Sequence, residues 1–397
     1  MTTIIISRNL LLGALNRLRH ATGRDQVLPI LSDLLFETGD TSLTVTAYNG
    51  SLKMSETVPL PEEVTHDGTP RTRFCVEART LRRVLASLEE QPLSMEVLGY
   101  QVRVQHVSGS FLLPIEDANE YPSSFPSVTD GGTDPRHLRL ESPGLARWIG
   151  LLYGSMPRDE LRPALNGILL EAGEDGRLTL AASDGHQLVR LRTAVKTGGD
   201  PARFVIPRKV VDILRRILPK TGRADFYFKE YGDGQRAVGQ FSVEVDHDEN
   251  RWVSLAFYGI DGRYPNYNSV IPASHNICVT VDRRGLVRSI DRLTLFANCS
   301  SLLGVFRVTA SRLEMKADDT DFGLSGEEHV DCETTGCPLP LSFCLQLPRV
   351  VSLLRRLTAG KVKMKLVDQT RPVILEPEPQ PDVEEVTMLL MPMLLSD

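Results

Sequence analysis

The chain has 397 residues and a formal net charge of −6, with 24% charged and 41% hydrophobic residues. That length suggests two or three domains, and the apolar content excludes intrinsic disorder. The negative total excludes a uniformly basic nucleic-acid binder, although it says nothing about how the charge is distributed.

The first segment of the chain predicts a short strand, 4–6, entering a helix over 8–20. It has no basic region ahead of its apolar residues, so we do not expect a signal peptide. No uncharged apolar stretch is long enough for a bilayer crossing. The six cysteines form no C-x-x-C pair, so we expect reduced thiols in a cytoplasmic protein rather than zinc ligands or disulfides.

A strand–turn–strand pattern occurs three times along the chain, at 28–50, 162–186 and, more weakly, 302–321. In the first two copies an apolar strand ends in Glu37 or Glu171, and a Gly/Asp turn leads into an alternating strand. Such alternation is typical of half-buried antiparallel hairpins.

A second pattern joins an entry strand to a basic helix, at 74–88, 204–218 and 343–359. Each copy carries an Arg-Arg pair opposite apolar residues at helical spacing. Further helices are expected before the hairpins, over 8–20, 144–154 and 283–297. Closing strands at 111–122, at 255–265 and near the C-terminus, with Pro/Gly/Ser-rich linkers after the first two, predict three α+β domains at 1–127, 136–264 and 275–397.

The charge is divided unevenly between these elements. The six helical windows 8–20, 77–88, 143–154, 207–218, 282–297 and 348–359 contain 18 basic and 4 acidic residues, so they carry +14 and the remainder carries −20. This asymmetry favours an anionic partner, although a solvated basic face balanced by acidic strands is the alternative. The windows contain few aromatic residues, which favours contact with a duplex backbone over stacking on single strands.

The repeats carry motifs that together resemble the β subunit of bacterial replicative DNA polymerase, the sliding clamp. The motifs are LPIL (28–31), LNG (165–167), SDGH (183–186), IPRK (206–209), DGRYPNY (261–267), RPVIL (371–375) and MPM (391–393). The resemblance implies an α+β fold of three clamp domains, each with two helices on antiparallel sheets, and a head-to-tail homodimer that forms a six-domain ring around duplex DNA.

The same resemblance implies a non-catalytic processivity factor for the replicative polymerase, without cofactor or metal. The implied partners are sequence-independent double-stranded DNA, the polymerase catalytic subunit, an ATP-dependent clamp loader, and other polymerases and repair or replication-control proteins that carry a clamp-binding peptide. The implied location is the bacterial cytoplasm, at replication forks on the nucleoid, with no membrane contact.

Three sets of residues match positions of functional importance in the family. The partner-peptide pocket would comprise Leu165, Ser183, Gly185, His186, Leu188, Pro265, Val270, Thr370, Pro372, Leu389, Leu390, Met391, Pro392 and Met393. The DNA-facing set would comprise Arg24, Arg82, Arg83, Arg208, Lys209, Arg215, Arg216, Arg284, Arg288, Arg355 and Arg356. At the dimer interface, Phe111 and Leu113 would meet Leu295 and Phe296 of the other chain.

The sequence departs from the family pattern in three places. Leu394 replaces the usual Arg near the C-terminus and Ser396-Asp397 extends it. Pro163 and Ala164 stand where an aromatic pair is common, so a DNA contact there is not carried over. Arg24 lies one place earlier than the corresponding arginine.

Two other classes of function compete with this hypothesis. An enzyme could use Asp184 and His186 as an acid/base pair, but such residues in a Ser-Asp-Gly-His turn more often shape the turn. The DFG at 321–323 lacks the other kinase motifs, the aspartates at 318, 319 and 321 fit a solvated turn, and no P-loop is present. A β-rich scaffold that binds only proteins would not require the positive charge concentrated on the helices.

Overall fold

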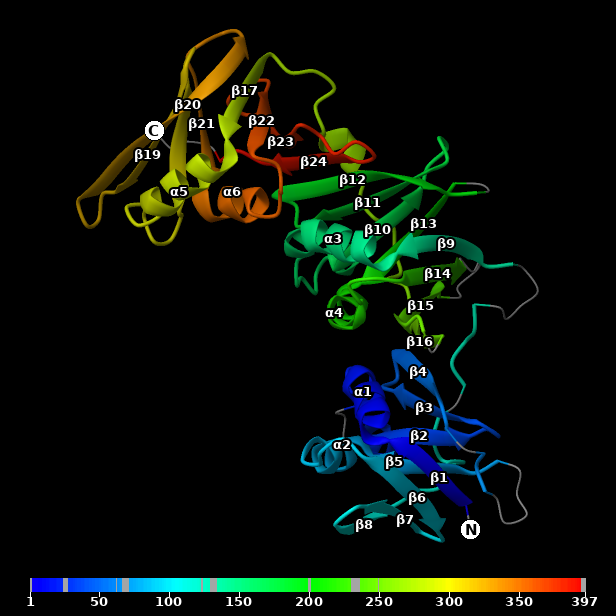
Figure 1. Ribbon diagram of the computed structural model, residues 1–397. Helices are drawn as coiled ribbons and strands as arrows, with labels where there is room; N and C mark the ends of the chain where they lie inside the picture. The colour runs from blue at the N-terminus through cyan, green and yellow to red at the C-terminus, as the bar shows by residue number, and fades with distance from the viewer. Residues whose placement is uncertain are drawn as a thin grey trace. The chain divides into compact units, whose positions relative to one another are not determined.

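The computed structural model describes residues 2–23, 28–61, 63–65, 71–122, 124–128, 134–198, 201–229, 236–248 and 250–393. Figure 1 shows the helices and strands of the chain, which divides into two compact units. Unit 1 comprises 1–146 and 212–259, and unit 2 comprises 147–211 and 260–397. The division passes through the predicted middle domain, and the predicted domain boundaries stay a prediction.

Unit 1 is built on two antiparallel sheets. The first has the order β1-β6-β7-β8, from β1 (Thr2–Ser7), β6 (Pro92–Leu98), β7 (Gln101–His106) and β8 (Gly109–Pro114). The second has the order β5-β2-β3-β4-β16-β15-β14-β9. Its strands are β2 (Asp33–Thr38), β3 (Ser42–Tyr48), β4 (Leu52–Pro59), β5 (Arg73–Glu77), β9 (Arg136–Glu141), β14 (Arg223–Lys229), β15 (Val238–Asp246) and β16 (Arg251–Tyr258). Helices α1 (Arg8–Leu18) and α2 (Ala78–Ala86) belong to this unit.

Unit 2 is built on one antiparallel sheet of the order β13-β10-β11-β12-β24-β23-β22-β17-β20-β19-β18-β21. Its strands are β10 (Gly167–Ala172), β11 (Arg177–Ser183), β12 (Gln187–Lys196), β13 (Ala202–Pro207), β17 (Ile277–Asp282), β18 (Leu303–Val308), β19 (Arg312–Asp319), β20 (Leu324–Gly336), β21 (Leu341–Gln346), β22 (Lys361–Leu366), β23 (Val373–Glu378) and β24 (Glu385–Leu390). Helices α5 (Arg283–Leu293) and α6 (Leu347–Leu354) belong to it. The division of the chain falls within α3 (Ser142–Leu152) and α4 (Arg208–Ile217).

The repeats predicted from the sequence are confirmed as structural elements. The three hairpins are β2–β3, β10–β11 and β18–β19, and each basic helix follows its entry strand without a break, as in β5–α2, β13–α4 and β21–α6. Short polar caps explain the abrupt starts of three helices. The side chains of Ser7, Glu77 and Asp282 accept hydrogen bonds from backbone N–H groups in the first turns of α1, α2 and α5.

Main-chain pairing joins successive repeats within each unit. In unit 1, β4 pairs with β16, with Met54 opposite Leu255. In unit 2, β12 pairs with β24, with Leu188 opposite Leu389. Both pairings are antiparallel, so each unit has a sheet that runs from one repeat into the next.

A buried carboxylate lies on β4, one of the two strands of the β4–β16 pairing in unit 1. Glu56 on β4 is fully buried and accepts hydrogen bonds from the guanidinium of Arg17 on α1, at 2.8 and 2.5 Å. Arg251 on β16 approaches the same carboxylate at 3.5 Å. Because the two arginines compensate its charge, the Glu56 carboxylate links α1 to both strands of the β4–β16 pairing.

A second buried carboxylate lies in unit 2. Glu384, just before β24, accepts two hydrogen bonds of 2.5 Å from the guanidinium of Arg147 and one of 2.6 Å from the indole N–H of Trp148. Both donors lie on α3, so this helix is fixed to the start of the last strand.

None of the helices in the part of the chain that the structure describes is long and apolar enough to cross a membrane.

Candidate functional site

Exposed arginines project from the helices of unit 1. Arg83 on α2 and Arg215 and Arg216 in the last turn of α4 are exposed, and Arg82 is half-buried. The apolar residues Leu81, Leu85, Ile213, Leu214 and Ile217 are buried on the opposite sides of these helices. The helical periodicity of the sequence therefore places the cationic side chains on the solvent side.

Exposed basic side chains also project from the helices of unit 2. Arg284 and Arg288 are exposed on α5, as are Lys209 in the first turn of α4 and Arg355 at the end of α6. Arg355 donates a hydrogen bond of 2.7 Å to the carboxylate of Asp291 on α5, so its charge is partly compensated.

Two arginines of the predicted DNA-facing set are engaged inside the protein instead. The guanidinium of Arg208 donates to the carbonyl of Met156 at 2.6 Å and lies over the ring of Tyr153. Arg356 is half-buried and donates to the carbonyl of Leu151 at 3.2 Å and to the hydroxyl of Ser155 at 3.0 Å. Helical spacing does not reveal this role, because it depends on the end of α3 lying beside both side chains.

Arg24 lies outside the described residues, as do Leu394 and the terminal Ser396-Asp397. Pro163 and Ala164 form a short 3-10 turn, η3 (Pro163–Leu165), directly before β10.

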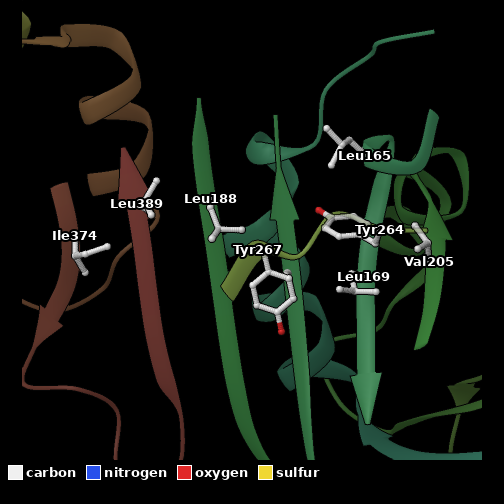
Figure 2. Close-up of a cluster of buried hydrophobic side chains, with 9 residues drawn as sticks. Leu165, Leu169, Leu188, Val205, Tyr264, Tyr267, Ile374 and Leu389 are labelled. Carbon is white, nitrogen blue, oxygen red and sulfur yellow. The ribbon is translucent and has the colours of Figure 1, made fainter. Parts of the chain in front are cut away.

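The predicted peptide-binding residues come together in unit 2 along the β12–β24 pairing. Figure 2 shows Leu188 and Leu389 on these neighbouring strands, with Ile374 on the next strand, β23. These side chains belong to a buried apolar cluster with Leu165 and Tyr264. The backbone N–H of Met391 donates to the carbonyl of His186 at 2.9 Å, which extends the ladder beyond the strand.

Apolar side chains at the edge of this cluster face solvent. The exposed fractions are 46% for Val270, 37% for Met391 and 40% for Met393. Leu165, Leu188, Leu389 and Leu390 are buried, whereas Ser183, Pro372 and Pro392 are half-buried and Gly185, His186, Pro265 and Thr370 are exposed. We refer to Val270, Met391 and Met393 as the apolar rim. A flexible thioether surface of this kind suits ligands of varied shape.

The Ser-Asp-Gly-His turn shapes this region rather than performing catalysis. One carboxylate oxygen of Asp184 accepts from the backbone N–H groups of His186 and Gln187, at 2.8 and 2.9 Å. The other accepts from Arg349 on α6 at 2.5 Å. Gly185 has φ +90, a left-handed backbone conformation that favours glycine. Sequence reasoning missed Arg349, whose partner is 165 residues away.

The predicted interface residues lie on a sheet edge and at a helix end. Phe111 lies in β8, an edge strand of unit 1, where it is half-buried and stacked on His106 of β7. Leu113 is only 7% exposed, whereas Leu112 between them is 53% exposed. Strand alternation explains this, because Leu113 lies opposite the buried Val102 of β7. Leu112, which the sequence analysis did not single out, is therefore more accessible than the predicted Leu113.

In unit 2 the corresponding residues are accessible. Leu295 and Phe296, just after α5, are both exposed, and the Phe296 ring lies against Gly326 of β20. The part of β20 over 324–331 pairs with β19 on one side, while β17 pairs only with 332–336.

Within the described residues, no group of three or more His, Cys, Asp or Glu side chains is arranged to hold a metal ion. The six cysteines are free thiols, and burial raises the pKa of Cys344 and, to about 12, that of Cys75. The DFG at 321–323 forms the β19–β20 turn, where Gly323 has φ +64.

Comparison with known proteins places the chain among replication proteins. Three models of the DNA polymerase III beta subunit match consecutive parts of it: the N-terminal domain at residues 2–125, the central domain at 139–266 and the C-terminal domain at 268–393.

Similar proteins match over almost the whole chain. A beta sliding clamp from Synechococcus elongatus is 26% identical over 92% of both chains, and one from Pseudomonas putida is 24% identical over 96% of this chain and 98% of that protein. The solved structure of a Pseudomonas aeruginosa sliding clamp bound to griselimycin superposes with a TM-score of 0.85, at 22% identity, over 99% of this chain and 100% of that one. The chain therefore belongs to the family of DNA polymerase III β subunits, the β sliding clamps, and is a non-catalytic replication protein.

Proposed function

We propose that two copies of this chain associate head to tail into a ring around duplex DNA, where the ring confers processivity on the replicative polymerase. The observation that carries the proposal is the repeated strand-plus-helix unit whose arginines are exposed in α2, α4 and α5. Cationic side chains on helices bind phosphates without reading sequence, and they release counterions as they do so. A ring held by topology needs such a weak contact, because a tight one would prevent sliding.

Two surfaces would close the ring. One is the edge strand β8, with Leu112 and Phe111 on it, and the other is the part of β20 over 324–331, near Leu295 and Phe296. An exposed strand edge with apolar neighbours is a ready site for pairing with another chain. The partner copy would therefore cover both surfaces, in the head-to-tail arrangement that the family resemblance implies.

The apolar rim of Val270, Met391 and Met393 would bind peptides of partner proteins. Exposed apolar side chains beside a firm, buried floor are the arrangement that peptide grooves use. Through this surface the clamp would recruit the polymerase catalytic subunit, the clamp loader and repair proteins. A Pseudomonas aeruginosa clamp of the same fold binds griselimycin. The protein would act in the bacterial cytoplasm at replication forks.

The decisive experiment measures retention on DNA of different topology. The protein is loaded onto nicked circular duplex with a clamp loader and ATP, and the complex is washed with high salt before and after linearisation. We expect retention on circles and loss from linear molecules. Retention that does not depend on topology would refute the proposal.

A paired set of variants tests whether the helices face the DNA. Arg284→Glu combined with Arg288→Glu reverses two exposed charges on α5 and should lower loading or retention. Arg307→Glu combined with Arg312→Glu, both exposed on strands β18 and β19, changes the charge by the same amount; this matched control should leave both unchanged. Equal loss in the two variants would show that α5 has no special part in DNA contact.

A further inference from the structure

A hollow of about 360 Å³ in unit 1 is lined mainly by cationic side chains. Arg19, which follows α1, lines it together with Arg79 and Arg82 of α2 and Arg216 of α4. His20 adds an imidazole. Three helices that are distant in the sequence thus bring four guanidinium groups to one concave surface.

Within the described residues these four guanidinium groups form no ion pair, although the Glu77 carboxylate acts electrostatically on Arg79. Arginines elsewhere in unit 1 pair with carboxylates, as Arg17 does with Glu56. Among the described residues, by contrast, no carboxylate lies within ion-pair distance of Arg19, Arg79, Arg82 or Arg216. Like charges repel, so such a group is stabilised when an anion lies among them.

The carboxylate of Glu77 also lines the hollow, but it is already engaged. It accepts hydrogen bonds from the backbone N–H groups of Arg79, at 3.0 Å, and Thr80, at 2.5 Å, and so caps α2. The hydroxyls of Thr22 and Ser32 line the same hollow but already donate to the carbonyls of Arg19, at 3.0 Å, and Pro29, at 2.8 Å. The guanidinium groups therefore supply both the positive charge and the N–H donors that a phosphate requires.

The imidazole of His20 reports the positive field of the hollow. Burial, followed by the nearby Arg19 and Arg216, lowers the pKa of His20 below its ordinary value of 6.5. A phosphate bound among these arginines would favour the imidazolium and raise the pKa again.

We propose that this hollow is a discrete phosphate-binding site that takes one phosphate group of a nucleic-acid strand. The inference rests on the proposed function, because it assigns a particular contact to helices that would otherwise provide only a diffuse field. Guanidinium groups hold phosphate oxygens through paired N–H donors, so several of them around one hollow fix a phosphate in place. A backbone phosphodiester and a free anion such as pyrophosphate share this chemistry.

Exposed arginines on the strands of unit 1 supply controls with the same change of charge. Arg82→Gln and Arg216→Gln each remove a lining charge, whereas Arg73→Gln on β5 and Arg139→Gln on β9 each remove an exposed charge that belongs neither to the lining nor to the DNA-facing set. The net charge of all four variants is the same, so a diffuse electrostatic effect would weaken them equally. Circular dichroism on each variant confirms that it is folded.

Binding is measured on the full chain by NMR of ¹³C-labelled histidine rings, with the His20 signal assigned from a His20→Gln variant. One arm titrates pyrophosphate and the other titrates a blunt 20-base-pair duplex without terminal phosphates. We expect both ligands to raise the pKa of His20. The two lining variants should bind each ligand about five-fold or more weakly, and the two controls should change less than two-fold.

The two arms also separate the sources of the phosphate. Binding of both ligands supports a site for backbone phosphates, and binding of pyrophosphate alone would overturn the assignment to a nucleic-acid strand. Equal weakening of lining and control variants, or no response of His20, would overturn the discrete site. Those failures leave the topology experiment unaffected, whereas failure of the wild type to remain on circles would refute the proposed function even if pyrophosphate binds.

Discussion

Replacing the buried carboxylate of Glu384 should destabilise unit 2 far more than replacing its exposed neighbour. The side chain of Glu384 is 4% exposed and accepts three hydrogen bonds, two of them from a guanidinium. Glu384→Gln keeps one acceptor oxygen and turns an NH2 group toward Arg147. Glu385, the next residue, pairs with Arg190 and Arg192 while its side chain is 45% exposed, so Glu385→Gln is the matched control.

The magnitude follows from what each variant leaves behind. Breaking a buried ion pair costs about 3–5 kcal/mol when the remaining charge stays buried. The side chain of Arg147 is 46% exposed and can reach water, which reduces the loss, but the indole N–H of Trp148 is buried and loses its acceptor. We therefore expect about 2–4 kcal/mol for Glu384→Gln, against about 0–1 kcal/mol for the exposed pair in the control.

Trp148 provides the assay, because the chain has only two tryptophans. In a Trp252→Phe background, urea unfolding followed by fluorescence reports on the indole that Glu384 holds. The midpoint should fall strongly in Glu384→Gln with the slope unchanged, and hardly at all in Glu385→Gln. Equal midpoints for the two variants would refute the view that the buried carboxylate stabilises this joint.

The same pair predicts a pH dependence. Burial raises the pKa of Glu384, but the hydrogen bonds from Arg147 and Trp148 outweigh it, so the pKa lies below the ordinary value of 4.5. A lowered pKa means that the carboxylate stabilises the folded protein above that value and loses its effect as the pH falls through the folded-state pKa. The advantage of wild type over Glu384→Gln should be constant at neutral pH and shrink below pH 4.5. An advantage that grows on acidification would contradict the sign.

Three further predictions address other parts of the molecule. Glu56→Ala should lower the free energy of unfolding of unit 1 by about 3–5 kcal/mol, because it leaves two arginines without their buried partner; unchanged chemical denaturation would exclude this role. Gly167→Ala should lower the free energy of unfolding of unit 2 by about 1–3 kcal/mol, since a Cβ there would lie 2.3 Å from the carbonyl oxygen of Ile206. An unchanged thermal unfolding temperature would show that β10 and β13 can move apart to accommodate the methyl group. Val270→Asp on the apolar rim should abolish polymerase stimulation without changing the oligomeric state. Val383→Asp, at a valine that is 66% exposed against 46% for Val270 and lies outside the rim, should not affect stimulation; the test compares primer extension with analytical ultracentrifugation.

The helices and strands were predictable from the sequence because each follows from a short residue pattern that is repeated along the chain. The hairpin and strand–helix patterns recur three times, so even the weak copy at 302–321 was found, as β18 and β19. Two of the three Arg-Arg pairs lie on the predicted helices, α2 and α4, and the third directly follows α6. Periodicity does not identify neighbours across the fold, and for that reason the placement of Arg356 in the DNA-facing set did not anticipate its contacts with Leu151 on α3 and with Ser155.

In the candidate sites, too, local motifs were predictable and contacts between residues far apart in the sequence were not. Sequence patterns identified the turn at 183–186 and the rim residue Met391, because each is a short local motif. The contact of Arg147 with Glu384 spans 237 residues and has no local trace. The register of β8 against β7 leaves Leu112 more exposed than the predicted Leu113, since Leu113 aligns with the buried Val102 and Leu112 with Arg103.

The backbone pairings of β4 with β16 and of β12 with β24 have a consequence for how this protein changes over time. Main-chain N–H and C=O groups are the same in every residue except proline, so a joint made from them places few demands on side-chain identity. Substitutions can accumulate along the strands as long as the two-residue alternation of apolar and polar positions is kept. A chain only 24–26% identical to the Synechococcus and Pseudomonas putida clamps can thus keep the same order of repeats. The two strand pairings can therefore persist as a backbone arrangement while the side chains around them diverge toward different partners.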